Sequence, residues 1–231
     1  EASGTALRVY ARPRDGAAPA GRGSACVIAL DRTIQPGYAW AFPAPDGTFN
    51  VGVGLFRGGN LRAAGVNLRA SLAALLAGQG PIGRRFGPFT AATPIAGAPV
   101  RTSLTGTPAA RPGLVIIGEA AGTTYAATGE GIGKAMESAL LLDELAAAPG
   151  VDLPALGPAY SAVLRARFGP RFRAYAVAQT WVSFPWFVDY VARRANESPY
   201  ITRKLSQFLS ESDVPTRVFS IRGLWRLTTA R

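Results

Sequence analysis

The sequence predicts an α+β fold in which an antiparallel sheet is followed by a strand, a glycine-rich loop and a helix, and then by C-terminal helices. Three observations predict it. Residues 5–56 alternate apolar runs with turns rich in proline and glycine, which is typical of antiparallel strands. Residues 112–148 place an apolar run, glycines and an alanine-rich helical pattern in succession, and beyond residue 150 apolar residues recur at helical spacing. The predicted parts are 1–104, 105–150 and 151–231.

The composition is that of a globular protein, with 48% hydrophobic and 17% charged residues among 231. Histidine is absent, which excludes a Ser/His/Asp triad and an imidazole metal site in this chain, and no metal site is predicted. The only cysteine, Cys26, lies in the apolar run SACVIAL and is predicted to be a buried, inert thiol.

The formal net charge of +11 comes almost entirely from arginine, since Lys134 and Lys204 are the only lysines. The arginines are spread along the chain and partly reflect the coding bias of a GC-rich genome, so we predict no nucleic-acid partner. The only methionine is Met136, and neither a signal peptide nor an 18-residue apolar run occurs. We therefore expect a fragment of a longer gene product that is cytoplasmic, with peripheral membrane contact possible.

Strands are predicted at 5–11 and 24–32, followed by a hairpin at 37–56. In the first hairpin strand, GYAWAFP, Tyr38, Trp40 and Phe42 share one face because successive side chains of a strand alternate. A four-residue loop at 44–47 would place these rings opposite Val53, Val51 and Phe49, and would leave the reverse face, with Gly52 and Gly54, almost bare. The aromatic face either lines an apolar space or packs on a core, and spacing alone favours the core.

Leucines at helical spacing predict a helix at 61–77, and residues 88–104 are expected to form short extended pieces. The run PGLVII at 112–117 has no alternation, which is typical of a strand covered on both faces in a parallel sheet, although no neighbouring parallel strands are evident. A helix should begin near Gly129 to Gly131 and end at Pro149 and Gly150. The remaining predicted helices are one at 160–168, one at 172–182, one starting at Pro185 and one after Ser198.

The strand, loop and helix at 113–135 are the strongest local indication of a ligand-binding site. A helix N-terminus presents unpaired amides and the positive end of a dipole, and glycines let a ligand approach them. The loop could therefore hold an anion or an electron-rich heterocycle, although it lacks the spacing of a P-loop or of a first dinucleotide-binding turn. A tight packing turn is the alternative. Glu130 could likewise do no more than complement the helix dipole.

The loop GEAAGTTYAATGEGIGKAMES resembles the second flavin motif of the geranylgeranyl reductase family of FAD-dependent oxidoreductases. PGYAWAFP, followed by GVG, resembles the substrate-pocket signature of the same family. The resemblance, which covers roughly residues 5–148, therefore favours a substrate-lining role for the hairpin. It implies FAD as cofactor, an apolar isoprenoid or lipid substrate, and an N-terminal half that carries the GxGxxG turn and partners this chain.

The resemblance assigns cofactor binding to Gly118, Glu119, Gly129, Glu130, Gly131 and Ile132, and substrate binding to Tyr38, Trp40, Phe42, Gly52 and Gly54. Two residues depart from the family pattern: Glu119 stands where the family has aspartate, and Ala126 where it has proline. Both departures are expected to weaken the hold on FAD. No catalytic proton donor is predicted.

The implied reaction is reduction of an isoprenoid double bond by hydride transfer from reduced flavin. Two alternatives remain open: flavin-dependent hydroxylation or halogenation on the same fold, and a non-catalytic binding protein with a degenerate flavin loop. Separately, the aromatic segment at 180–194 could line a lipid tunnel or dock on a membrane, or it could be a helical core element, which the interruptions at Pro185 and Asp189 favour.

Overall fold

The computed structural model of the chain describes residues 3–14, 25–56, 65–104, 108–150 and 152–210. These residues form two compact units, one made of residues 4–99 and the other of the described residues from Val100 onward together with Ser3. Helices and an antiparallel sheet occur together, which confirms the predicted α+β class. The division into three predicted parts stays a prediction.

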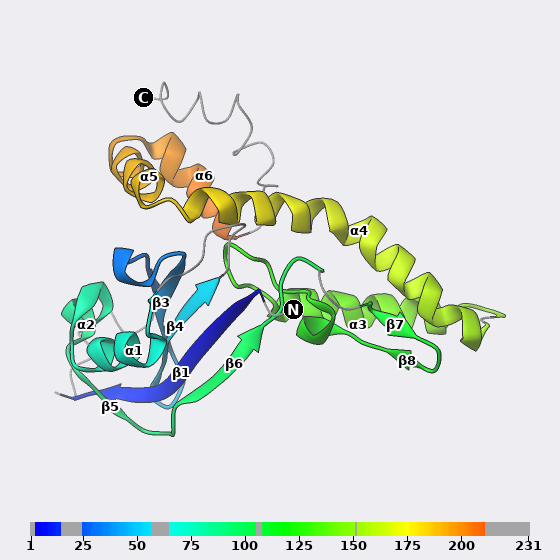
Figure 1. Cartoon of the computed structure of the whole chain (residues 1–231), viewed down its shortest axis with the longest axis horizontal. Helices are drawn as coiled ribbons and strands as arrows, with labels where there is room; N and C mark the ends of the chain where they lie inside the picture. The colour runs from blue at the N-terminus through cyan, green and yellow to red at the C-terminus, as the bar shows by residue number, and fades with distance from the viewer. Residues whose placement is uncertain (1–2, 15–24, 57–64, 105–107, 151, 211–231) are drawn as a thin grey trace. The chain divides into compact units, whose positions relative to one another are not determined.

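The first unit is built on an antiparallel sheet with the strand order β2-β3-β4-β1-β5, in which β6 also pairs with β1 (Figure 1). The strands predicted within residues 5–56 are confirmed, and the extended pieces at 88–104 supply two more. The bounds are β1 Gly4–Pro13, β2 Val27–Ala29, β3 Gly37–Pro43, β4 Phe49–Phe56, β5 Phe89–Ala91 and β6 Ala96–Val100.

Two helices, α1 (Leu68–Leu76) and α2 (Gly80–Phe86), cover one face of this sheet (Figure 1). The side chain of Asn67 accepts a hydrogen bond from the amide of Ala70 and so fixes the start of α1. The predicted helix at 61–77 is confirmed over α1, while residues 61–64 lie outside the described ranges. Sequence reasoning missed α2 because its glycines and proline disfavour a helix.

The core of the first unit lies between these helices and the sheet. Every second residue of the central strands contributes to it, as the period of two in a strand requires. Its fully buried members include Val9, Ala41, Val51, Leu72 and Ile82. Cys26 is exposed, contrary to prediction, because it precedes β2 and lies outside this core.

The hairpin register differs by one residue from the predicted register. Pro43 lies opposite Phe49, and Trp40 lies opposite Gly52, so the loop has five residues, 44–48. The prediction that the rings face Phe49, Val51 and Val53 is therefore wrong. The face with Ala39 and Ala41 packs on the core, and the aromatic side chains lie on the opposite face with the glycines of β4.

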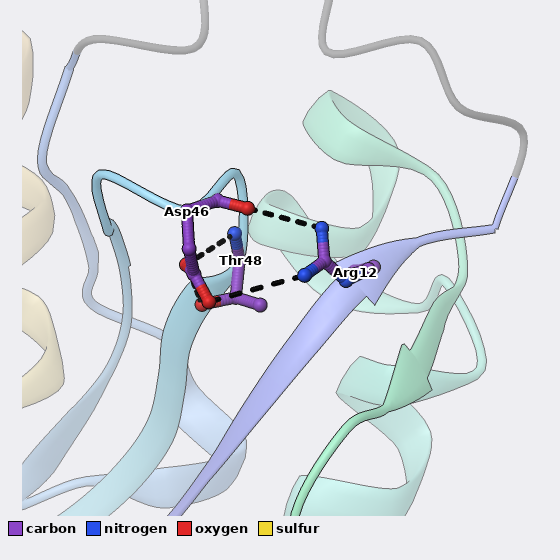
Figure 2. Close-up of polar contacts among 3 residues, drawn as sticks. All are labelled: Arg12, Asp46 and Thr48. Atoms are coloured by element: carbon purple, nitrogen blue, oxygen red, sulfur yellow. Dashed lines mark hydrogen bonds and ion pairs between the residues drawn. The ribbon is translucent and has the colours of Figure 1, made fainter.

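The turn at Asp46 explains the register (Figure 2). One carboxylate oxygen of Asp46 accepts hydrogen bonds from the amide of Thr48 at 3.0 Å and from its hydroxyl at 2.6 Å. These bonds fold Thr48 into the loop, so it does not pair with Pro43. Arg12 of β1 donates to the carbonyl of Asp46 and lies 3.9 Å from its carboxylate. The bonds from Thr48, and more weakly the charge of Arg12, hold the pKa of Asp46 below its ordinary value.

The second unit contains a short hairpin, β7 (Ala110–Arg111) and β8 (Leu114–Val115), a 3-10 turn at Gly118–Ala121, and four helices (Figure 1). The expectation that residues 112–117 form a fully covered parallel strand is not met among the described residues. Leu114 pairs antiparallel with Arg111, and Leu114 and Ile117 are exposed. The helices are α3 Ile132–Ala146, α4 Leu153–Val182, α5 Pro185–Glu197 and α6 Pro199–Leu209.

The two helices predicted at 160–168 and 172–182 form one continuous helix, α4, which contains Pro158 and Pro170. Prolines inside a helix cost about 3 kcal/mol each. However, the apolar stripe continues across Pro170, since Leu164, Phe168 and Phe172 are all buried in one cluster. Burial of large apolar side chains contributes about 1.5–3 kcal/mol each, which offsets the loss. The predicted starts of α3, α5 and α6 are confirmed.

Candidate functional site

Four aromatic rings form a continuous row on the sheet face that α1 and α2 do not cover. We call Phe42, Trp40, Tyr38 and Phe56 the aromatic ladder; its ring centroids follow one another at 6.4, 6.0 and 5.7 Å. Tyr38, Trp40 and Phe42 are partly exposed, and none of the four belongs to the core beneath the helices. The expectation that the aromatic face packs on that core is therefore wrong. The partly exposed rings of Tyr38, Trp40 and Phe42 form an apolar wall, and Phe56, which is only 4% exposed, closes one end of it.

The glycines of β4 let the indole of Trp40 lie close to the sheet. A side chain at Gly52 would overlap the six-membered ring of Trp40, and at Gly54 it would lie 3.4 Å from that ring. The ring nitrogen of Trp40 donates to the side-chain oxygen of Asn50 at 3.0 Å, which fixes the ring's orientation. The predicted bare reverse face does not exist, and the close approach over Gly52 is made by the protein's own tryptophan.

Tyr38 lies in the middle of the aromatic ladder. Desolvation by the surrounding side chains raises the pKa of Tyr38 to about 12, although part of the ring remains accessible. Because the folded-state pKa lies above the ordinary value, the resulting stability is present below pH 10 and is lost as the pH rises through 12. At neutral pH the phenol is protonated and presents a hydroxyl rather than a phenolate.

In the second unit, residues 118–131 form the glycine-rich loop that leads into α3. Gly118, Gly122 and Gly129 have φ values of 62°, 79° and 68°, a region that disfavours other residues. The amide of Gly118 donates to the hydroxyl of Ser138 at 3.0 Å, so the start of the loop is tied to α3. Gly118 is buried, whereas the carboxylate of Glu119 is exposed.

The loop and the start of α3 place several polar groups together. Glu130 accepts a hydrogen bond from the amide of Gly133 at 2.8 Å and thereby caps the helix. A side chain at Gly131 would come within 2.5 Å of the hydroxyl oxygen of Thr124, so that hydroxyl lies directly beside the helix start. The structure thus brings Glu130, Gly131 and Ile132 together, and Ile132 is 82% exposed. Whether they bind a cofactor stays a prediction.

Some buried oxygens in the loop have no hydrogen-bond partner within the part of the chain that the structure describes. They include the hydroxyls of Thr123 and Thr124 and the second carboxylate oxygen of Glu130. A buried polar group without a partner costs about 1–3 kcal/mol, so a ligand that donates hydrogen bonds here would be favoured. Sequence reasoning missed both threonines, since only the glycines beside them carried a signal.

Tyr125 anchors the loop to the helices. Its ring is fully buried and stacks on Tyr175 at a centroid distance of 4.0 Å, with Phe172 at 4.7 Å. Tyr175 in turn stacks on Phe208 of α6, and its hydroxyl donates to the carbonyl of Phe208. Lys134 of α3 is also buried; it pairs with Glu137 and lies 5.6 Å from the centroid of the Tyr125 ring. The loop is therefore held in place from two sides.

The aromatic segment at 180–194 packs mainly within the second unit. Phe187 is buried with Ile201, and Trp181, Phe184 and Tyr190 pack against them, while Trp186 is exposed. This arrangement agrees with a helical core element. No described helix is long and apolar enough to cross a membrane, and the described residues contain no cluster of metal-ligating side chains.

Comparisons with solved structures bear on the fold of the whole chain. A geranylgeranyl bacteriochlorophyll reductase-like protein of Thermoplasma acidophilum matches 98% of this chain with a TM-score of 0.58 and 21% identity. A triple mutant of a flavin-dependent brominase matches 78% of the chain with a TM-score of 0.51 and 16% identity. The chain shares the fold of the matched part of each of these proteins. This confirms, for the fold, the resemblance that the two motifs indicated.

The match is to part of each solved protein only. The chain spans 51% of the reductase-like protein and 46% of the brominase. No family model and no curated protein matches the chain.

Proposed function

We propose that this chain is part of an FAD-dependent oxidoreductase that reduces C=C bonds of an apolar, isoprenoid-like substrate. The observation that carries the proposal is the fold shared with the reductase-like protein over 98% of the chain, joined to two sequence motifs in the same order. The glycine-rich loop and the aromatic ladder, where those motifs lie, are the two sites on which the proposal rests.

The residues of the glycine-rich loop suit a flavin. Gly118, Gly129 and Gly131 keep the backbone open, and the start of α3 offers amides and the positive end of a helix dipole. The unpartnered oxygens of Thr123, Thr124 and Glu130 would accept hydrogen bonds from a ligand's N–H or hydroxyl groups. Glu119 is exposed, so its carboxylate is accessible to a ribityl hydroxyl.

Bound FAD in its reduced form supplies the hydride that such a reduction requires. The chain's own residues would bind the substrate and orient it. Tyr38, Trp40 and Phe42 offer an apolar wall for the substrate, and Gly52 lets Trp40 lie flat enough to form it. Such a wall excludes water from an alkene and holds it by apolar contact.

Hydroxylation on the same fold is the second candidate, and the match to a brominase is the observation that keeps flavin-dependent oxidation open. Halogenation is disfavoured because flavin-dependent halogenases need a pocket lysine near the strand that corresponds to β3. The two lysines of the chain, Lys134 on α3 and Lys204 on α6, belong to the second unit and not to the unit that carries the aromatic ladder. A non-catalytic binding protein is the third candidate.

A visible spectrum tests the proposal first. Purified full-length protein should show flavin absorbance bands, directly or after FAD is added and excess removed. Gly131→Val should weaken FAD binding at least tenfold, about 1.4 kcal/mol, because the new side chain meets Thr124 at the helix start. Isothermal titration with FAD measures this loss.

Gly169→Ala, which lies within α4, is the matched control and should keep wild-type affinity. Thermal unfolding of both variants separates lost binding from lost folding. A protein that stays colourless with FAD would instead support the non-catalytic candidate.

We further propose that the exposed side of α3 docks the remaining half of the flavin-binding fold. Ile132, Met136 and Leu140 recur every four residues and are 82%, 64% and 61% exposed. We call these three residues the apolar strip. Contiguous exposed apolar surface of this kind marks an interaction site, and about half of the reductase-like protein has no counterpart in this chain.

The double variant Met136→Lys/Leu140→Lys should reduce the fluorescence of the dye 8-anilinonaphthalene-1-sulfonate bound to the 231-residue chain. Because both side chains are exposed, the midpoint of thermal unfolding should change by no more than about 2 °C. Leu153→Lys, also exposed but outside the apolar strip, should leave the dye signal unchanged. Unchanged dye binding in the double variant would argue against an accessible apolar strip.

A further inference from the structure

Two arginines of β1, Arg8 and Arg12, lie on the same sheet face as the aromatic ladder, because every second residue of a strand points to the same face. Arg8 of β1 pairs with Gly52 of β4, and Gly52 pairs with Trp40 of β3, so the three residues form one row across the sheet. Because Gly52 has no side chain, nothing of that row stands between Arg8 and the indole. Two strand spacings, about 10 Å, separate the backbones of Arg8 and Trp40.

The guanidinium of Arg8 leans along β1 toward the next row. Its central carbon lies 5.1 Å from the centroid of the Tyr10 ring, a stacking contact that orients the planar group. Tyr10 pairs with Asn50, and Asn50 pairs with Phe42. Asn50 uses its side-chain oxygen to accept from Trp40, which turns its amide NH₂ away from that bond.

The sheet face is therefore polar at one end and apolar at the other. Arg8 and Asn50 provide donors beside the Phe42 end of the aromatic ladder. Toward the opposite end, the rows carry Ala6, Gly54 and Tyr38, and the ladder finishes at Phe56. A ligand with one charged end and one long apolar chain matches this gradient.

Arg8 has no carboxylate partner among the residues that the structure describes. It is exposed, and none of the ion pairs within the described ranges includes it. Arg12, four residues further along the same strand and on the same face, contrasts with it, because its guanidinium is already paired with Asp46 (Figure 2). β1 thus carries one arginine that is paired with a carboxylate, Arg12, and one that has no such partner among the described residues, Arg8.

We infer that Arg8, assisted by Asn50, anchors the anionic head group of an amphiphile whose apolar chain lies along the aromatic ladder. The inference rests on the proposed function and deepens it, since it specifies a substrate that is an anion at one end. Guanidinium groups recognise phosphate and carboxylate in a planar, two-pronged geometry, and the stack on Tyr10 holds Arg8 ready for that contact.

The test compares two probes that have the same apolar chain and differ in head group, the anionic n-dodecyl phosphate and the uncharged n-dodecanol, below their aggregation concentrations. Isothermal titration of the full-length protein should show dodecyl phosphate binding about tenfold more tightly. Arg8→Ala should abolish that preference and leave dodecanol binding unchanged. Arg8→Lys should keep part of the preference, because the charge remains and the planar stack on Tyr10 is lost.

Arg12→Ala is the matched control, since it removes the same charge from the same strand. It should leave the tenfold preference intact. Trp40→Ala should weaken the binding of both probes. This result would show that both bind on the aromatic ladder. Circular dichroism of the Arg8 and Arg12 variants should match that of the wild type, because both side chains are exposed.

Four results would overturn the inference. Equal binding of both probes, or an unchanged preference in Arg8→Ala, would remove the role of Arg8 while the apolar wall of the proposed function stands. Equal losses in Arg8→Ala and Arg12→Ala would mean that general positive charge attracts the phosphate. If neither probe binds, the result would count against the apolar wall itself, and so against the proposed function as well.

Discussion

Replacing Tyr125 with alanine is expected to lower the free energy of unfolding by about 3–5 kcal/mol, the range for removing a buried aromatic side chain. The ring is fully buried between Phe172 and Tyr175. Its loss leaves a cavity that those two helical rings cannot fill without shifting. The same change should abolish FAD binding at the proposed site, because the glycine-rich loop loses the side chain that anchors it to α4.

Chemical denaturation followed by circular dichroism measures the stability, and FAD titration at low temperature measures binding to the molecules that remain folded. Tyr125→Phe is the matched control: it keeps the ring stacked on Tyr175 and should retain most of the stability and the FAD affinity. A Tyr125→Ala variant that unfolds at the wild-type denaturant concentration would mean that the loop is not held by this ring.

In the glycine-rich loop, the sequence predicts the local backbone but not the tertiary contacts. Glycines before an alanine-rich helix located the start of α3 correctly, because the positive φ values of Gly118 and Gly129 and the end of a helix are local properties. The role of Tyr125 was not predictable in the same way. Its partners lie on helices far along the chain, and an aromatic residue in a loop carries no local sign of the rings that it will meet.

The helices after residue 150 show that tertiary packing can also override a local sequence signal. Pro170 is a strong local signal for a break, and it lies between the two helices predicted at 160–168 and 172–182. Phe168 and Phe172 flank it and are both buried in the core of the second unit, so tertiary packing keeps α4 continuous. Local propensity is outweighed where large apolar side chains on both sides of a proline face one core.

The hairpin at 37–56 was predicted correctly in its two strands but not in its register. Alternation fixes which side chains share a face, and it grouped Tyr38, Trp40 and Phe42 correctly. The pairing partner depends on the loop length, and that length is set by the hydrogen bonds of Asp46 to Thr48. A shift of one residue exchanges the two faces of β4, which moved its glycines under the aromatic rings.

This register makes Gly52 the residue of β4 that is least tolerant of a side chain. Gly52→Ala is expected to lower the free energy of unfolding by about 2–3 kcal/mol. The added methyl group would lie 2.6 Å from the carbonyl oxygen of Leu7 and would also overlap the ring of Trp40. Backbone on one side and a packed indole on the other leave it no space, and denaturant unfolding measures the cost.

Gly54→Ala is the matched control on the same strand and the same face. Its methyl group would lie 3.4 Å from Trp40 and 3.5 Å from Phe56, which are ordinary contacts, so its stability should stay within about 0.5 kcal/mol of the wild type. In a Trp40→Ala background the cost of Gly52→Ala should fall without vanishing, because the carbonyl of Leu7 remains. Equal effects at Gly52 and Gly54 would contradict the register, since in the predicted one neither glycine faces an aromatic ring.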